Sequence, residues 1–183
     1  GHYNIVKYYI DTCMVFMDEI SKEPTNIIKE EKYEEIQSLL KYSIKYGKYS
    51  ILTHLLEDFR NVEIDKKIEG IPSLCYAAQY GYISIVRLIF DDLIKKGISK
   101  DEMLHLLNES DRSPLIDASL NGYVDIISFL IKQGSDPNKC DQRKISPLCA
   151  AAMSNNSLSA MKELIKNGAK IQPDKYEKLI IHI

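Results

Sequence analysis

Apolar residues recur three and four positions apart in several short stretches of the chain, a pattern typical of amphipathic helices. The clearest stretch is SPLIDASLNGYVDIISFLIKQGSDPN, residues 113–138. Pro114 suits the first turn of a helix, and Gly122 tolerates the left-handed conformation that ends one. A second apolar face follows at Val124, Ile127, Leu130 and Ile131. The pattern therefore predicts a helix, a tight turn, a second helix, and a closing turn at residues 135–138.

This unit recurs along the chain. Ser146 opens a second copy, 33 residues after Ser113 (146 − 113). Gly81 and Gly47 hold the place of Gly122 in two earlier copies, 34 residues apart (81 − 47). A unit of this size cannot bury its own apolar face, so the copies must stack on one another.

The residues that recur at the same positions of these units resemble those of ankyrin repeats. The family's Thr-Pro-Leu-His stands here as Ser113-Pro114-Leu115-Ile116 and Ser146-Pro147-Leu148-Cys149, its Gly-His as Gly81-Tyr82 and Gly122-Tyr123, and its Gly-Ala-Asp-x-Asn as residues 134–138. Upstream the pattern is looser, since Pro72-Ser73-Leu74 inverts the first two residues and the unit at Gly47 keeps only Leu40, Ser43 and the glycine. The resemblance implies an all-α solenoid of paired antiparallel helices with short β-turn fingers.

The resemblance covers nearly all 183 residues. It divides the single array into a half repeat at 1–25, units at 26–66, 67–108, 109–141 and 142–172, and the start of a cap or next unit at 173–183. Because the pattern begins in mid-repeat, we expect the chain to be a fragment of a longer ankyrin-repeat protein.

One unit departs from the family pattern. The distance from Gly81 to Gly122 is 41 residues (122 − 81), about eight more than a standard unit. Ser99 and Glu102 have the spacing of a capping box, which predicts an inserted helix at residues 101–107 in place of a finger. We expect Met103, Leu104 and Leu107 to pack against the outer helix of the same unit.

Composition excludes several classes of function. The chain has 24 Lys plus Arg against 26 Asp plus Glu, a net charge of −2, so no basic excess favours nucleic acid or an anionic membrane. No apolar run is long enough to span a bilayer. The four cysteines form no C-x-x-C pair and no histidines lie at i, i+4, so no metal or cofactor is expected. Free thiols suit a reducing cytosol, and we expect a cytoplasmic monomer.

Catalysis lacks support in the sequence. No nucleophile elbow, phosphate loop or paired metal ligands accompany the serines, histidines and aspartates. His54 and His105 fit packing or surface positions, and the prediction is that this chain is not an enzyme.

Binding is better supported. The resemblance implies that the concave face is formed by three positions in each unit and by the finger tips. In the units of Gly47 and Gly81 these positions are Tyr42, Lys45, Tyr46, Tyr76, Gln79 and Tyr80. Farther along they are Asp117, Leu120, Asn121, Ala150, Met153 and Ser154, with finger residues Asp111, Arg112, Arg143 and Lys144. Tyrosines are enriched in interface hot spots, which favours a binding role for the four here; the alternative is that the rings pack between inner helices.

The sequence therefore predicts a non-enzymatic protein-interaction scaffold that binds a protein partner through its concave face. The alternative is the targeting arm of a longer enzyme, or of a secreted effector from a pathogen or large virus that would act in the host cytosol. Abundant Ile, Lys, Asn and Tyr, residues with A/T-rich codons, are the basis for such a source.

Asn138 carries two hypotheses. An asparagine at this turn hydrogen-bonds the backbone and holds the finger. Ankyrin domains resemble one another in offering this asparagine to a cytosolic hydroxylase, with a leucine eight residues before it, and here that position is Leu130 (138 − 8). The triplets Asn108-Glu109-Ser110 and Asn155-Asn156-Ser157 match glycosylation acceptors, which we interpret as chance in a cytosolic protein.

Overall fold

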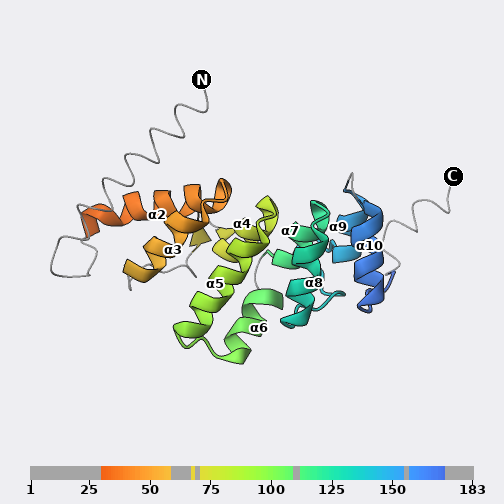
Figure 1. The fold of residues 1–183 in the computed structure, drawn as a ribbon. Coiled ribbons are helices and arrows are strands. Elements are labelled where there is room, and N and C mark those ends of the chain that lie inside the picture. The colour runs from red at the N-terminus through yellow and green to blue at the C-terminus, as the bar shows by residue number, and fades with distance from the viewer. Residues whose placement is uncertain (1–29, 59–66, 69–70, 109–111, 155–156, 172–183) are drawn as a thin grey trace, which may run out of the picture.

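The computed structural model describes residues 30–58, 67–68, 71–108, 112–154 and 157–171. Inner and outer helices alternate along the chain and stand side by side in one row (Figure 1). The pairs are α2 (Glu30–Lys45) with α3 (Tyr49–Asp58), α4 (Ser73–Tyr80) with α5 (Ile83–Lys95), α7 (Pro114–Leu120) with α8 (Val124–Lys132), and α9 (Pro147–Ala152) with α10 (Ser157–Lys166). The predicted all-α solenoid is confirmed.

Glycine closes the hairpins within the first three pairs. Gly47, Gly81 and Gly122 have φ values of 67°, 83° and 74°, in the left-handed region that favours glycine. The next helices begin as their sequences predict. Pro114 and Pro147 stand in the first turns of α7 and α9, and the Ser146 hydroxyl accepts a hydrogen bond from the Cys149 N–H (3.2 Å).

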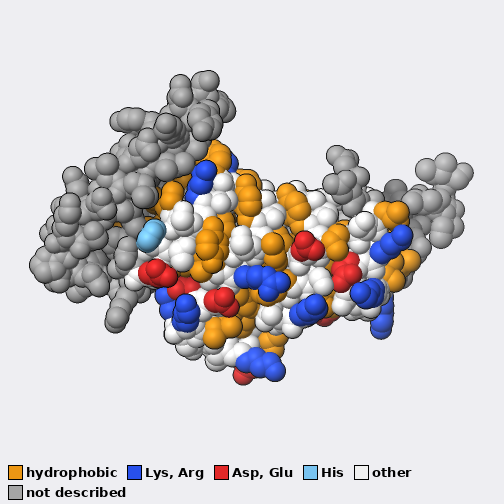
Figure 2. Space-filling view, viewed as in Figure 1, with side chains coloured by type: hydrophobic (Ala, Val, Ile, Leu, Met, Phe, Trp, Pro, Cys, Tyr) orange, Lys and Arg blue, Asp and Glu red, His pale blue; other side chains and the backbone are white. Residues whose placement is uncertain are grey.

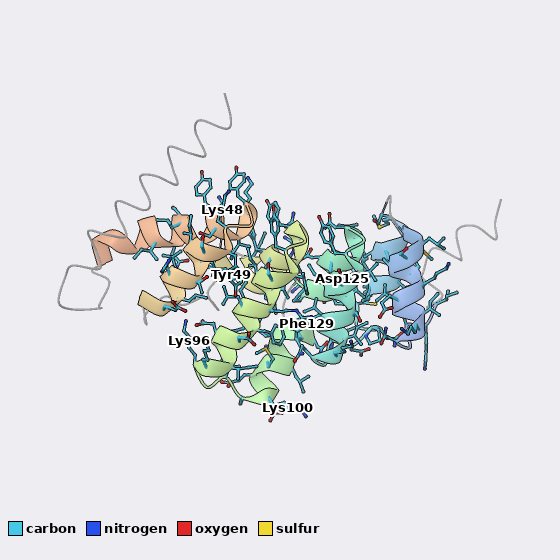
Figure 3. The ribbon with its side chains drawn as sticks, in the orientation of Figure 1. Lys48, Tyr49, Lys96, Lys100, Asp125 and Phe129 are labelled. Atoms are coloured by element: carbon cyan, nitrogen blue, oxygen red, sulfur yellow. The ribbon has the colours of Figure 1, made fainter. Side chains whose placement is uncertain are left out.

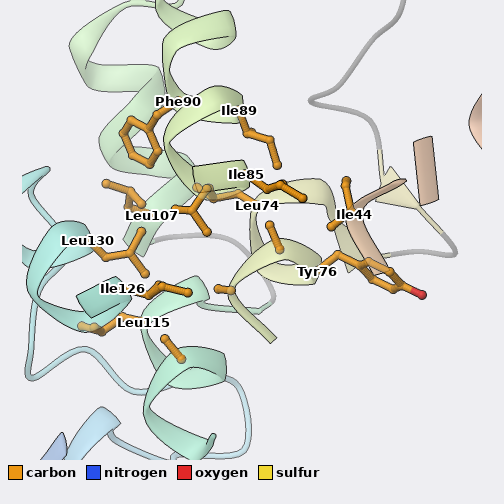
Figure 4. Close-up of a cluster of buried hydrophobic side chains, with 14 of the residues drawn as sticks. Ile44, Leu74, Tyr76, Ile85, Ile89, Phe90, Leu107, Leu115, Ile126 and Leu130 are labelled. Atoms are coloured by element: carbon orange, nitrogen blue, oxygen red, sulfur yellow. The ribbon is translucent and has the colours of Figure 1, made fainter. Parts of the chain in front are cut away.

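The core runs continuously through the row of units. Helix α4 packs between α2 and α7, and α7 packs in turn against α9, while the outer helices contact their neighbours in the same order. Figure 4 shows Leu74, Ile85, Leu115 and Ile126 meeting between the second and third pairs. The buried apolar side chains of the described residues form one cluster, so each unit depends on its neighbours for burial of its apolar face.

Short turns link the pairs. Strands β1 (Lys67–Ile68) and β2 (Ile71–Pro72) pair antiparallel ahead of α4, as a β-turn finger requires. Ahead of α9, the Asp141 N–H donates to the Ile145 carbonyl (3.1 Å), and Lys144 takes a left-handed φ of 62° at the tip. The fingers implied by the resemblance are therefore present at both of these links.

The inserted helix predicted at 101–107 is observed as α6 (Lys100–Asn108). Its capping box forms, with the Ser99 N–H and hydroxyl donating to the Glu102 carboxylate at 2.8 Å and 2.7 Å. Leu107 is fully buried between Phe90 of α5 and Leu130 of α8 (Figure 4). Leu104 lies over Gly134, just beyond α8 of the next unit. The prediction that the apolar residues of α6 pack only against the outer helix of their own unit therefore needs correction, because α6 contacts two units.

The half repeat predicted at 1–25 and the element predicted at 173–183 lie outside the described residues, and the unit boundaries stay predictions. No helix of the described residues has the length and apolar character that crossing a membrane would require.

Candidate protein-binding face

Two tyrosines at the C-terminal end of α2 lie on the first described unit of the concave face, one in the helix and one just after it. Tyr42 and Tyr46 are one helical turn apart and 38% and 39% exposed. Their rings stack with centroids 5.8 Å apart and planes 7° from parallel. The ammonium of Lys45 lies 5.6 Å from the centre of the Tyr46 ring, a cation–π contact. These residues form an accessible aromatic platform, as expected of a contact surface.

The tyrosines of α4 differ from those of α2. Tyr76 is only 5% exposed, so the prediction that it is an exposed contact residue is wrong. Its ring belongs to the hydrophobic core and lies near Ile44, where α2 packs on α4 (Figure 4). Tyr80 is half-buried, with its ring centre 5.1 Å from that of Tyr76. Packing between inner helices, the alternative interpretation, is correct for Tyr76.

The middle of the face holds a hydrogen-bonded polar group that the structure assembles from three predicted residues. Arg112 donates from Nε to both carboxylate oxygens of Asp117 (3.0 Å and 2.8 Å) and from Nη2 to Oδ1 (2.9 Å). Nη2 also donates to Oε1 of Gln79 on the preceding unit (3.1 Å). Asp117 is 5% exposed, so its predicted role as an exposed contact residue is wrong; it anchors Arg112 instead.

Electrostatics favours a structural role for this group. Burial raises the pKa of Asp117, an effect that the Arg112 guanidinium opposes. Hydrogen bonds to Asp117 raise the pKa of Arg112, so the guanidinium stays charged. Burial also raises the pKa of the Cys75 thiol, which donates to the Arg112 carbonyl (3.2 Å). A buried neutral thiol is a poor nucleophile, and its hydrogen bond to the Arg112 carbonyl joins two units.

The C-terminal part of the face is apolar with a charged edge. Leu120 and Met153 occupy equivalent positions in adjacent units (153 − 120 = 33) and both are exposed. Ala150 is buried, which corrects its prediction as an exposed contact. Arg143 is exposed on its finger and pairs with Asp141 (2.9 Å).

The remaining predicted positions of the face add little. Asn121 donates from its side-chain amide to the Asp117 carbonyl (2.9 Å), Ser154 is half-buried and Lys144 is exposed. Asp111 lies outside the described residues.

Asn138 holds its turn, as predicted. Its side-chain amide donates to the Gly168 carbonyl (3.0 Å), and its Oδ1 accepts from the Lys170 N–H (2.8 Å). Its own N–H donates to Oδ1 of Asp136 (2.8 Å). Both ends of the amide are thus used to bind the next unit, while hydroxylation of Asn138 stays a prediction.

These repeated units also have relatives among known proteins. A family model described as "Ankyrin repeats (3 copies)" matches residues 40–141 and 115–183. The chain belongs to the ankyrin-repeat family.

Three matches illustrate the range of proteins to which the chain is similar. The chain is 22% identical over 146 residues to Alpha-latrocrustotoxin-Lt1a of Latrodectus tredecimguttatus, covering 79% of this chain and 9% of that protein. It is 26% identical over 120 residues to the Ovis aries ankyrin repeat, SAM and basic leucine zipper domain-containing protein 1, covering 65% and 24%. It is 34% identical over 95 residues to the Drosophila melanogaster transient receptor potential cation channel subfamily A member 1, covering 52% and 8%. The chain therefore spans at most about a quarter of the length of these relatives.

Asn108 has a role in the ankyrin array that the sequence pattern did not reveal. Its amide donates to the Gly134 carbonyl (3.0 Å), and its Oδ1 accepts from the Asp136 N–H (2.8 Å). These are the contacts that Asn138 makes one unit later. The available signal was the 30-residue spacing from Asn138 (138 − 108), which the inserted helix obscured.

Two further tyrosines pack across ankyrin units. A side-chain carbon added to Gly47 would lie 2.6 Å from the Tyr82 ring, and one added to Gly81 would lie 2.5 Å from the Tyr123 ring. Each ring therefore rests on the glycine turn of the preceding unit. Glycine is required there for its backbone conformation and also for the space that the ring occupies.

The opposite side of the ankyrin array carries a groove between α3 and α5. It has a volume of about 440 Å³ and includes Leu56, Leu88 and the Lys96–Asp92 ion pair (2.8 Å). Figure 3 shows Lys96 at the C-terminal end of α5. Figure 2 shows acidic, basic and apolar side chains mixed over the outer helices. Asp92 is held by Lys96, and Glu57 is a second acid in the lining of the groove.

Proposed function

We propose that this ankyrin array is a non-enzymatic scaffold that binds a segment of a partner protein along its concave face. The observation that carries the proposal is a row of exposed or half-buried apolar side chains at the C-terminal ends of successive inner helices. Tyr46 and Tyr80 directly precede the glycine turns of the first and second helix pairs. Leu120 and Met153 lie two positions before the corresponding turn position in the third and fourth pairs. Rows of this kind on a protein surface mark interaction sites.

The frame behind this row supports the proposal. The Gln79–Arg112–Asp117 contacts and the two asparagine contacts fix adjacent units to one another. A face held in this way loses little conformational freedom when it binds, so more of the contact energy remains as affinity. The polar groups at the centre of the face are occupied with one another, which favours binding over chemistry.

A selection experiment tests the proposal. Random 12-residue peptides displayed on phage would be selected on the purified chain, and dissociation constants of the winners measured by fluorescence anisotropy. We expect the triple variant Tyr46→Ala, Leu120→Ala and Met153→Ala to weaken binding by roughly 10- to 100-fold, because exposed anchors dominate such interfaces.

The matched control removes exposed apolar residues from the outer helices, as Ile94→Ala, Leu158→Ala and Ile165→Ala. Its affinity for the same peptides should match that of the original chain. Equal affinities of both triple variants, with unchanged circular dichroism, would contradict a binding role for the concave face.

The targeting-arm alternative uses the same face. It assigns any chemistry to other parts of a longer protein, and it is supported by the small share of each relative that this chain spans. The complete coding sequence, together with activity assays of the full protein and of this array, separates the two. We also propose that the scaffold is cytosolic and monomeric. Light scattering of the purified chain tests whether it is a monomer.

A further inference from the structure

Lysine and tyrosine alternate around the turn between α2 and α3. The sequence there is KYSIKYGKY, residues 41–49. Tyr42, Tyr46 and Tyr49 are all exposed, and the ring of Tyr82 covers Gly47 from the next unit while remaining exposed itself. Aromatic rings from two units therefore surround one turn. We call Tyr42, Lys45, Tyr46, Lys48, Tyr49 and Tyr82 the lysine–tyrosine surface.

Two lysines of this surface carry charge that no acid of the described residues balances. Lys45 has its ammonium over the Tyr46 ring, and Lys48 lies at the turn beside Tyr49 (Figure 3). Neither takes part in an ion pair within the described part of the chain.

The arginines in the middle and at the C-terminal end of the face are different. Arg112 is paired with Asp117, and Arg143 is paired with Asp141. Lys144, an exposed finger residue of the face, likewise takes part in no ion pair within the described residues. The lysine–tyrosine surface therefore groups two of these three lysines at one turn, in a chain whose net charge is −2.

We propose that the lysine–tyrosine surface binds an acidic segment of a partner protein, in which Asp or Glu residues alternate with apolar ones. Lysine ammonium groups and tyrosine hydroxyls donate hydrogen bonds to carboxylates, and the ring faces offer apolar contact to the intervening residues. The stacked pair Tyr42 and Tyr46 is already ordered, which lowers the entropic cost of binding. This inference rests on the proposed scaffold function and names the chemistry of its partner.

Other anionic ligands fit less well. Nucleic-acid affinity grows with the number of phosphates that lysine and arginine neutralise, and two uncompensated lysines would neutralise few. Anionic membranes are recognised by clusters of about four to eight basic residues. A short acidic peptide needs only a few cations beside an apolar platform.

The test uses the complete 183-residue chain and phage selection of random 12-residue peptides. We expect the selected peptides to be enriched in Asp and Glu next to apolar residues, relative to the unselected library. The double variant Lys45→Glu/Lys48→Glu should weaken binding of a selected peptide by at least about tenfold. A peptide with its acids replaced by lysine should bind that variant better than it binds the original chain.

The control is Lys95→Glu/Lys132→Glu, which reverses two exposed lysines in the last turns of α5 and α8. It should change affinity by less than about twofold, since the charges lie away from the surface. Should the Glu variant fail to fold by circular dichroism, Lys45→Gln/Lys48→Gln replaces it, with the same expected direction.

Several results would overturn the inference. Selected peptides without acid enrichment, or with equal affinity for the original chain and the Lys45/Lys48 variant, would refute it. If such peptides still lost affinity for the Tyr46/Leu120/Met153 variant, the scaffold function would be supported and the preference for an acidic partner would be refuted. Failure to select any binding peptide would refute both. Binding of a 20-nucleotide oligo-dT or of phosphatidylserine vesicles in preference to the peptides would assign the surface to another ligand.

Discussion

Two neighbouring junctions of this array are held by the same pair of hydrogen bonds, although the chain reaches them by different routes. At one, Asn108 ends an inserted helix; at the other, Asn138 lies in an ordinary turn. Each amide binds a carbonyl at 3.0 Å and an N–H at 2.8 Å in the next unit. The junction requires an asparagine side-chain amide beside the C-terminal end of the next outer helix. The length of the connecting segment that precedes this asparagine can vary.

The junction at Asn108 has additional support. Leu107 enters the core there, and Tyr123 rests on Gly81 at the other end of the same junction. At the following junction, the sequence has Asn156 where the repeat places Tyr123 (156 − 123 = 33). The inserted helix thus adds apolar contacts to a junction that the asparagine alone could hold.

Among changes at these two junctions, loss of the Leu107 side chain should lower the stability of the array most. Leu107 is fully buried, so Leu107→Ala should lower the free energy of unfolding by about 2–5 kcal/mol, measured by urea denaturation. Leu106→Ala is the control, because Leu106 is only partly buried. Similar costs at both positions would mean that α6 merely covers the array.

A methyl group at Gly81 should be the next most damaging change. Gly81 and Gly97 share a φ of +83°, but an added Cβ at Gly81 would meet the Tyr123 ring at 2.5 Å, while at Gly97 it meets nothing within 4 Å. Gly97→Ala should cost about 1–2 kcal/mol for its left-handed backbone. Gly81→Ala should cost about 1–3 kcal/mol more, since the ring must move. Equal melting temperatures of the two variants would rule out the packing role of Tyr123.

Removing each asparagine amide tests the equivalence of the junctions directly. Asn108→Ala and Asn138→Ala each delete two hydrogen bonds, so each should cost about 1–3 kcal/mol. Hydrogen exchange provides the crossed control. Asn108→Ala should release the Asp136 N–H and spare that of Lys170, and Asn138→Ala should do the reverse. Loss of both amide protections in either variant would show that the junctions are not independent.

The smallest effect concerns the capping box of α6. A hydrogen bond from the Ser99 hydroxyl, joined by one from its N–H, lowers the pKa of Glu102. A lowered pKa in the folded state means that the stabilisation is present above the unfolded pKa, about 4.5, and is lost as the pH falls through the folded value.

Glu102→Gln should therefore be slightly less stable than the original chain at pH 7 and equal to it at pH 3, by urea denaturation. Asp101→Asn, in the same helical turn, controls for loss of an acid outside the box. A stability difference for Glu102→Gln that does not depend on pH would exclude the carboxylate as its cause.

The local pattern of the sequence determined most of the fold. Apolar spacing, the Ser-Pro starts and the glycine turns predicted the paired helices, because these signals act within a few residues of one another. The capping box predicted residues 101–107 as helix, and α6 spans Lys100–Asn108. Such features depend on backbone conformation and local hydrogen bonds, which neighbouring residues largely set.

Only the tertiary structure decided which residues of the concave face are accessible. Tyr42, Tyr76, Asp117 and Ala150 hold the same position in successive units, yet Tyr42 is exposed and the other three are buried. Tyr76 is covered where α2 packs on α4, and Asp117 is enclosed by Arg112, which also reaches Gln79 of the preceding unit. Accessibility at a repeated position depends on what the adjacent unit places beside it, and the sequence of one unit does not contain that information.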